Sequence, residues 1–265
     1  MRILPAFLLS ISLCIASLSA QEFDHTHKAY DAILEKYALE GNVDYQSLHT
    51  NPRALKRYLN TMATVSKPQF QKFSKEQQLA FLFNLYNAAT LKLIIDHYPV
   101  KSIKDIGSWF KGPWDQPVVW LFGTTITLNN LEHDILRKGY NEPRLHLALV
   151  CAAKGCPPLR TEAYTAEKLN TQLNDQTHTF LAGSSGLRIN RQTRTVYVSS
   201  IFKWYGKDFI SIYTPGAGFV GLNKIERAVA AFCSRYVSDQ KRAYLMTGGY
   251  TVKYIDYDWS LNEGD

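Results

Sequence analysis

Apolar residues recur at helical spacing in several stretches of this chain, and each recurrence predicts an amphipathic helix. The longest stretch starts at Ser74 and Gln77, a pair with capping-box spacing, and it ends before Pro99. The predicted helices span residues 23–39, 52–62, 74–98, 131–137, 165–181 and 222–237.

Shorter segments with β-rich or alternating residues lie between these predicted helices. Gly123 divides the first segment into two strands, and the second segment alternates like a hairpin. The third segment lies near the C-terminal end and predicts a strand or a packed extension. The three segments are residues 118–128, 187–199 and 254–261.

The apolar run RLHLALV, residues 144–150, leads into Cys151 and is bounded by turn residues. Its length and its boundaries predict a buried strand, so we expect Cys151 where that strand ends in a loop. Helices and strands do not alternate regularly along the chain. The pattern therefore indicates an α+β fold, with mixed helices around a small, largely antiparallel sheet.

The chain begins with an apolar segment that follows a basic residue and is closed by small residues. This pattern predicts a signal peptide over residues 1–20 with cleavage after Ala20, and thus export to the periplasm or the cell exterior. Cys14 suggests a lipoprotein as an alternative, although the bulky Leu13 before it does not fit a usual lipobox. We expect no later transmembrane segment, and we expect residues 21–265 to form a single domain.

Composition narrows the class of partner. A hydrophobic share of 46% with 13% aromatic residues supports a real core, and the formal net charge is +7. The basic residues are scattered and no nucleic-acid motif is present, so we expect no nucleic-acid partner. The charge favours an anionic surface or a small anionic ligand, or it simply reflects a solvated basic surface.

Three cysteines follow the predicted leader: Cys151, Cys156 and Cys233. Cys233 lies in a helical pattern and should be a small buried apolar residue. Cys151 and Cys156 are five residues apart, which fits either a reactive thiol at Cys151 or a structural disulfide, since exported thiols tend to pair. We expect no metal and no cofactor, because this spacing is loose for zinc and no second ligand pair accompanies it.

A nucleophilic cysteine needs a base, and two histidines compete for that role. His133 follows Glu132 on a predicted helix, but neighbouring residues on a helix point in different directions, so Glu132 cannot simply orient His133. His146 precedes Cys151, yet side chains alternate along a strand, which places these two on opposite faces unless a bulge intervenes. Each histidine also has a plain alternative as a hydrogen-bonded packing residue.

Polar residues in apolar surroundings mark further candidates. Asn84 and Asn87 share a face of the long predicted helix and need hydrogen-bond partners when buried. They serve either as structural braces or as donors that line a binding site. Trp204, Tyr205 and Asp208 combine aromatic rings with a carboxylate, which suits ligand binding, orientation of a base or the capping of a turn.

Five ordered motifs, LFNLYNAATL, LEHDILR, RLHLALVCAAKGCPPL, FKWYGKDF and YDWSLN, together resemble the domain of unknown function 547 family over residues 79–262. The resemblance implies a fold family and a site region, and it names no reaction. The positions that match the family motifs are Asn84, Tyr86, Asn87, Glu132, His133, His146, Cys151, Cys156, Pro157, Trp204, Tyr205 and Asp208.

An analogy to papain-like or transglutaminase-like cysteine enzymes would require a permuted order, because both histidines precede Cys151 here. Fold analogy alone does not establish function.

Two functional hypotheses follow. The first is an exported thiol enzyme in which Cys151 attacks an amide or peptide-like acyl group. His133 or His146 would be the base, Glu132 or Asp208 would orient it, and Asn84 or Asn87 would stabilise the oxyanion.

The second hypothesis is a non-catalytic periplasmic binding protein for a small peptide or thiol compound, with a structural Cys151–Cys156 disulfide. The residues expected to contact the substrate or ligand are Asn84, Asn87, Tyr86, Cys156, Trp204, Tyr205 and Asp208. Thiol–disulfide exchange is a third option, but the C-x4-C spacing differs from the usual C-x-x-C.

Overall fold

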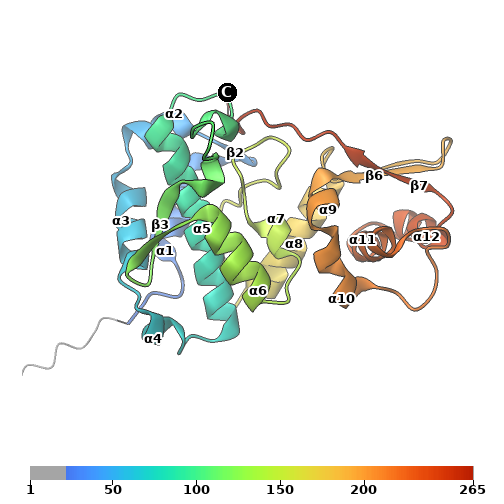
Figure 1. Cartoon of the computed structure of the whole chain (residues 1–265), viewed down its shortest axis with the longest axis horizontal. Helices are drawn as coiled ribbons and strands as arrows, with labels where there is room; N and C mark the ends of the chain where they lie inside the picture. Colours follow the sequence, from blue (N-terminus) through green and yellow to red (C-terminus); the bar gives the residue numbers. More distant parts are fainter. Residues whose placement is uncertain (1–21, 265) are drawn as a thin grey trace, which may run out of the picture.

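Two hydrophobic clusters organise the computed structural model of the protein, which describes residues 22–264. The first cluster is built mainly by residues between 23 and 173, and the second mainly by residues between 180 and 250. Figure 1 shows the corresponding two lobes side by side along the long axis. The predicted signal peptide lies outside the described residues, so export stays a prediction.

The first lobe is mainly helical, with two short hairpins at its periphery. Its elements are α1 (Lys28–Tyr37), β1 (Ala38–Leu39), β2 (Asn42–Val43), α2 (Tyr45–Thr50), α3 (Arg53–Ala63), α4 (Lys67–Phe70), α5 (Lys75–His97), η1 (Ile103–Asp105), η2 (Pro113–Asp115), β3 (Pro117–Leu121), β4 (Thr124–Thr127), the π-helix η3 (Asn130–Leu136), α6 (Arg137–Gly139) and α7 (Leu145–Ala148).

The second lobe packs helices against a three-stranded sheet. Helix α8 joins the lobes, because its Leu173 belongs to the first cluster and its Phe180 to the second. The elements are α8 (Leu169–Ala182), β5 (Leu187–Asn190), β6 (Thr195–Ser199), α9 (Ser200–Tyr205), η4 (Gly206–Phe209), α10 (Ile210–Tyr213), α11 (Lys224–Ser234), α12 (Asp239–Thr247) and β7 (Thr251–Ile255).

The expected α+β class is confirmed, although the strands form three small sheets rather than one. β1–β2 and β3–β4 are antiparallel hairpins, and the predicted turn at Gly123 joins the second pair. In the third sheet β5 pairs antiparallel with β6, whereas β6 pairs parallel with β7. The parallel pairing requires the chain to return after α12, a helix that the sequence pattern did not predict.

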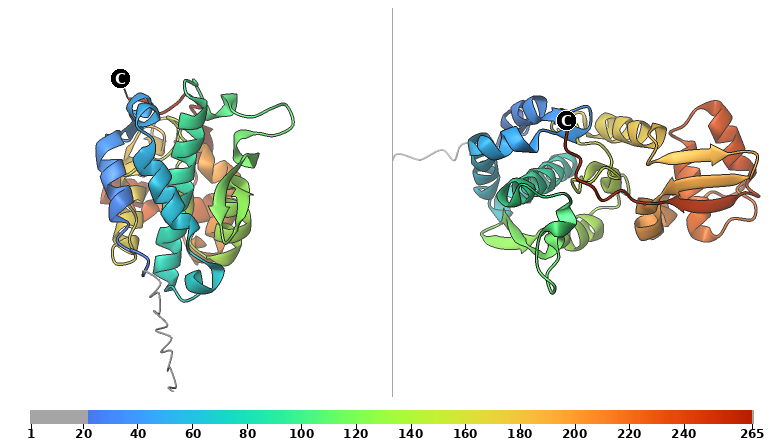
Figure 2. Two further views of the ribbon diagram at one scale, coloured as in Figure 1. Left: turned by 90° about the vertical axis from the view of Figure 1, so that its left-hand side faces the viewer. Right: turned by 90° about the horizontal axis from the view of Figure 1, so that it is seen from above.

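Helix α5 is the centre of the first lobe (Figure 2). The predicted capping box is present: the Ser74 side chain accepts from the Gln77 backbone, and the Gln77 side chain accepts from the Ser74 backbone. Every residue from 79 to 91 is buried. A helix that is buried on all sides requires neighbours on all sides, and the neighbours of α5 include α2, α3, β3 and η3.

By length and composition α5 would suffice to cross a membrane, contrary to the expectation that no such segment follows the leader. Within the fold, 89% of its most apolar window is buried. A helix buried to this extent belongs to the protein core, and a core helix can be as long and as apolar as a membrane-spanning helix.

The prediction of a strand before Cys151 is wrong. Residues 145–148 form the short helix α7, and an extended, unpaired segment follows at Leu149 and Val150. The Asn87 side chain supplies the hydrogen bonds that a neighbouring strand would otherwise provide: Nδ2 donates to the Ala148 carbonyl at 3.0 Å, and Oδ1 accepts from the Val150 amide at 2.9 Å. The apolar run of residues 144–150 indicated burial, but it gave no sign that a side chain would take the place of a neighbouring strand.

The C-terminal segment after β7 runs back from the second lobe across the first (Figure 1). Its backbone pairs with the cysteine loop: the Lys154 amide donates to the Ser260 carbonyl, and the Gly155 amide donates to the Asp258 carbonyl, both at 2.9 Å. Further on, the buried Asn262 side chain accepts from the Tyr45 hydroxyl at 2.8 Å. The sequence prediction of a packed extension here is therefore correct beyond Ile255.

We predict that Asn84→Leu and Asn87→Leu each lower the free energy of unfolding by about 2–4 kcal/mol, since each leaves two buried backbone groups unpaired. Asn84 bonds both the amide and the carbonyl of Tyr164, at 2.9 and 2.8 Å. Urea denaturation measures the effect.

Thr90→Val is the matched control, because the Thr90 hydroxyl donates only within α5, to the Tyr86 carbonyl. It should cost less than about 1 kcal/mol. Equal stability of all three variants would show that the two amides are not braces.

Candidate functional site

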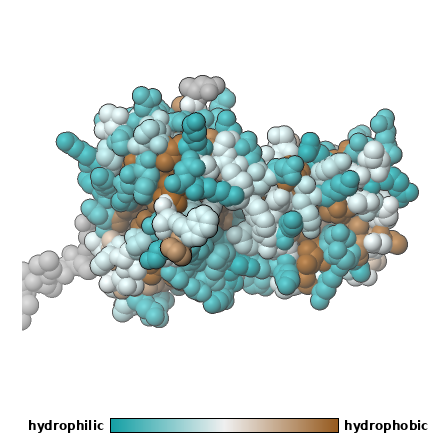
Figure 3. Space-filling model, turned by 45° about the horizontal axis from the view of Figure 1, so that its top comes forward, coloured by the Kyte–Doolittle hydropathy of each residue, from teal (hydrophilic) through white to brown (hydrophobic). Residues whose placement is uncertain are grey.

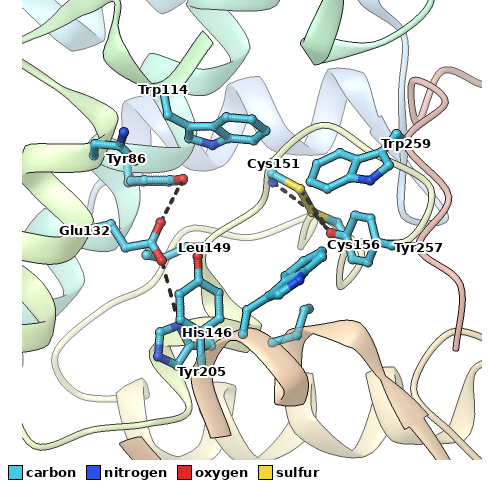
Figure 4. A pocket seen from close by; sticks show the side chains of 13 residues that line it. Tyr86, Trp114, Glu132, His146, Leu149, Cys151, Cys156, Tyr205, Tyr257 and Trp259 are labelled. Carbon is cyan, nitrogen blue, oxygen red and sulfur yellow. Dashed lines mark hydrogen bonds and ion pairs between the residues drawn. A yellow bond between two sulfur atoms is a disulfide. The ribbon is translucent and has the colours of Figure 1, made fainter. Parts of the chain in front are cut away.

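A cavity of about 250 Å³ lies where the two lobes and the C-terminal segment meet. Figure 4 shows its 13 side chains, six of which are tyrosine or tryptophan. The lining residues are Tyr86, Trp114, Asn129, Glu132, His146, Leu149, Cys151, Cys156, Ile201, Trp204, Tyr205, Tyr257 and Trp259. Cavities between lobes are common sites for small ligands.

One wall is the disulfide between Cys151 and Cys156, whose Cα atoms are 6.3 Å apart. The Cys151 amide donates to the Cys156 sulfur at 2.9 Å, and the Tyr257 hydroxyl donates to the same sulfur at 3.0 Å. The Tyr257 hydroxyl also lies 3.1 Å from the Cys151 sulfur. Of the two sequence alternatives for this pair, the structure contains the disulfide.

Four aromatic side chains form a second wall. Trp204 stacks on Trp259 with ring centroids 5.7 Å apart, and Tyr257 lies against both rings at 4.9 and 4.5 Å. Trp114 meets Trp259 edge-on at 5.8 Å. Trp204 is 45% exposed, so this cluster reaches the outer surface of the protein.

The polar end of the cavity is the carboxylate of Glu132, opposite the disulfide in Figure 4. Its side chain is only 9% exposed. The Tyr86 hydroxyl donates to Oε2 at 3.3 Å. Glu132 comes from the π-helix η3, a wide helical turn of a type that occurs often at functional sites.

His146 lies between Glu132 and Asp208. Its Nε2 is 2.8 Å from Asp208 Oδ2, and its Nδ1 is 3.8 Å from Glu132 Oε1 and has no hydrogen-bond partner among residues 22–264. The ring stacks on Tyr205 with centroids 4.0 Å apart and planes 9° from parallel. These contacts fix the orientation of the imidazole.

Burial lowers the pKa of His146, and this effect outweighs the hydrogen bond to Asp208 and the neighbouring negative charges, which raise it. Burial acts to raise the pKa of Asp208, but hydrogen bonds from His146 and Arg137 hold it well below its usual range. At neutral pH, His146 is therefore uncharged, and its Nε2–H donates to the ionised carboxylate of Asp208. Arg137 completes the group with two bonds to the same carboxylate, at 2.7 and 2.9 Å.

Several predicted site residues lie elsewhere. His133 is half-exposed and does not line the cavity. Its Nδ1 lies 3.1 Å from Nη1 of Arg137. Asn84 and Asn87 use both ends of their amides on backbone groups and do not line the cavity. No histidine hydrogen-bonds the Cys151 sulfur among the described residues.

Other cavity residues were not predicted as site residues. Trp114, Leu149, Ile201, Tyr257 and Trp259 all line the cavity. The motif YDWSLN contained a signal for Tyr257 and Trp259, because two large aromatics near the end of a chain need a packing partner. Cys233 is buried in α11 as predicted, and burial raises the pKa of its thiol.

Within residues 22–264, no cluster of three or more histidine, cysteine, aspartate or glutamate side chains is arranged to hold a metal ion.

Fold and site together define an α+β protein with a ligand-sized aromatic cavity between two lobes. Residues 70–181 match the family model described as "Protein of unknown function, DUF547", which confirms the resemblance over this region. The matched region ends before Trp204, Tyr205, Asp208 and the C-terminal segment. Neither the curated proteins nor the solved structures provide a match.

We predict that iodoacetamide leaves Cys151 and Cys156 unlabelled unless a reductant is added first. After reduction Cys151 should react before Cys156, because Cys151 is half-buried whereas Cys156 is buried. Cys233 should react only after unfolding. Mass spectrometry of peptides measures each site, and labelling of Cys151 without reductant would show that the thiol form predominates.

We also predict that His146 makes the fold less stable in acid. Since the pKa of His146 is lowered on folding, the unfolded chain takes up the proton first. Above about pH 6.5 this histidine does not change the free energy of unfolding with pH. As the pH falls from there towards the folded pKa, the free energy of unfolding decreases. NMR titration of the ring measures the shift directly.

His146→Gln should flatten the decline in stability below about pH 6.5. Part of the decline should remain, since burial also lowers the pKa of His27, to about 4. His178→Gln is the control, because it removes an exposed histidine that lies outside the His146–Asp208 contact. An identical slope in the His146 variant would contradict the assignment.

Proposed function

We propose that the protein binds a small ligand with a cationic nitrogen in the aromatic cavity, with the Cys151–Cys156 disulfide as a structural wall. The observation that carries the proposal is the buried carboxylate of Glu132, which lines the cavity without a lysine or arginine within 4.0 Å among the described residues. This is the binding-protein hypothesis of the sequence, made specific for the charge of the ligand.

Burying an unpaired carboxylate is costly, by several kcal/mol in real proteins. Its ion-pair contacts within the described residues are two histidines, His133 Nδ1 at 4.0 Å and His146 Nδ1 at 3.8 Å. His146 is neutral at pH 7 because burial lowers its pKa. A cationic ligand would supply the missing charge and so would bind with a gain that a neutral ligand lacks.

Hydrogen bonding favours the same ligand class. The buried Nδ1 atom of His146 points toward Glu132 and has no donor. An ammonium group carries up to three N–H donors, so one group can serve Glu132 Oε1 and this nitrogen together. An anionic ligand would be repelled by the Glu132 carboxylate at this end of the cavity.

The aromatic walls suit the body of such a ligand. Rings of Trp and Tyr attract cations through their π faces, and cages of this kind recognise ammonium ligands. Two of the rings already accept a protein cation, Lys104 over Trp259 at 3.8 Å and Arg137 over Tyr205 at 5.1 Å. A peptide with a free amino terminus meets both requirements, whereas a small quaternary amine offers the charge and the fit to the aromatic walls but no N–H donor.

We predict that choline quenches or shifts the tryptophan fluorescence of the protein, whereas its neutral isostere 3,3-dimethylbutanol binds at least about tenfold more weakly. Alanyl-alanine amide should likewise bind better than its N-acetyl form, in which the positive charge is removed. Isothermal titration measures both pairs.

Glu132→Gln should remove most of the preference for the charged member of each pair. The matched control is Asp134→Asn, on the same helical segment, because Asp134 is exposed and pairs with Lys138. Equal affinity for charged and neutral probes, or a preference that survives in Glu132→Gln, would contradict the proposal.

The thiol-enzyme hypothesis is a second candidate, because Cys151 lines the same cavity as His146, whose Nε2 contacts Asp208. It requires prior reduction of the disulfide. Reduced protein should then release p-nitrophenol from p-nitrophenyl acetate in a burst that Cys151→Ser abolishes and Cys233→Ser does not. Absence of a burst from reduced, folded protein would exclude acyl transfer to Cys151 from this ester.

A further inference from the structure

Away from the cavity, a turn between η1 and η2 projects from the first lobe, where Figure 2 shows it as a long green loop. The Ser108 amide donates to the Lys111 carbonyl at 2.9 Å, and the Lys111 amide donates to the Ser108 carbonyl at 3.2 Å. Gly107 has a φ of +112°, and a side chain there would collide with the Lys111 carbonyl. The turn is therefore a defined hairpin with Trp109 and Phe110 at its tip.

Both tip side chains are almost fully in solvent, Trp109 at 96% and Phe110 at 92% exposed. They are the two most exposed large apolar side chains in the described chain. The root of the turn is held by Gln116, whose Nε2 donates to the Lys111 and Gly112 carbonyls at 3.2 and 3.1 Å. The fold thus holds two apolar rings out into water, where they give up burial free energy.

The chain around the tip, residues 101–115, carries three lysines and two aspartates and so has a small positive net charge. Lys101, Lys104 and Lys111 are all exposed. The Asp105 carboxylate accepts hydrogen bonds from the backbone amides of Lys101 and Ser102. The Asp115 carboxylate accepts one from the Asn129 side chain. Elsewhere on the face in Figure 3 the surface is mostly hydrophilic, with separate hydrophobic patches.

We propose that this tip, residues 107–112, inserts Trp109 and Phe110 into the interface of an anionic lipid membrane. Aromatic rings partition to the headgroup level, and lysines beside them pair with lipid phosphates. A protein partner would need a groove that receives a convex two-residue tip, whereas a bilayer accepts such a tip without a specific shape. The lysines add the charge complementarity that an anionic lipid surface requires.

The full chain should co-sediment with vesicles of phosphatidylglycerol and phosphatidylcholine, but only weakly with phosphatidylcholine alone. Trp109→Ala with Phe110→Ala should lower the partition coefficient by about tenfold or more, because the apolar contact is lost. Lys101→Gln with Lys111→Gln should weaken binding to anionic vesicles and remove its salt dependence. Brominated lipids should quench tryptophan fluorescence in the wild-type chain more than in the tip variant.

The matched control is Val220→Ser with Met246→Ser, which removes two exposed apolar side chains far along the chain, 70% and 50% exposed. It should leave vesicle binding unchanged, and thermal melting checks that all variants are folded. The proposal is overturned if the wild type does not sediment with anionic vesicles, if the tip variant binds equally well, or if the control loses as much. Self-association of the wild type that the tip variant abolishes, without vesicle binding, would overturn it in favour of a second copy of the chain.

Discussion

The structure depends on polar side chains of a buried helix that hold irregular backbone in place. Asn84 and Asn87 extend from α5 and bond the backbone at Tyr164 and at residues 148–150. A buried backbone group without a partner costs about 1–3 kcal/mol, so an unpaired segment could not pack against α5 without them. The cysteine loop starts directly after the segment that Asn87 holds, which links the core of the first lobe to the candidate site.

The cavity is assembled from parts that lie far apart in the sequence. Helix α5 and η3 supply Tyr86 and Glu132, α9 supplies Trp204, and the C-terminal segment supplies Tyr257 and Trp259. Backbone hydrogen bonds between the C-terminal segment and residues 154–155 close the third side. The disulfide acts within this arrangement, since one tyrosine hydroxyl contacts both of its sulfurs.

The two ends of the cavity differ in charge and in hydrogen-bonding groups. The Arg137–Asp208–His146 group is internally balanced, because Asp208 accepts from both partners and stays ionised. Glu132 lies beyond it, next to the side of the imidazole that has no proton to offer. One end of the cavity is thus rich in acceptors, and the other end is formed by aromatic rings and sulfur. This asymmetry, rather than the net positive charge of the chain, underlies the proposed preference for a cationic ligand.

The sequence by itself determined the helices with strong periodicity, the capping box of α5, the turn at Gly123, the burial of Cys233 and the family of residues 70–181. Those features depend on local hydrogen bonds or on apolar spacing, which neighbouring residues encode. Tertiary structure alone decided that the run before Cys151 is not a strand, that Asp208 contacts His146, and that Tyr257 and Trp259 complete the cavity. These depend on contacts between residues more than 50 positions apart, for which no local pattern exists. They also depend on a buried amide that replaces the hydrogen bonds of a neighbouring strand.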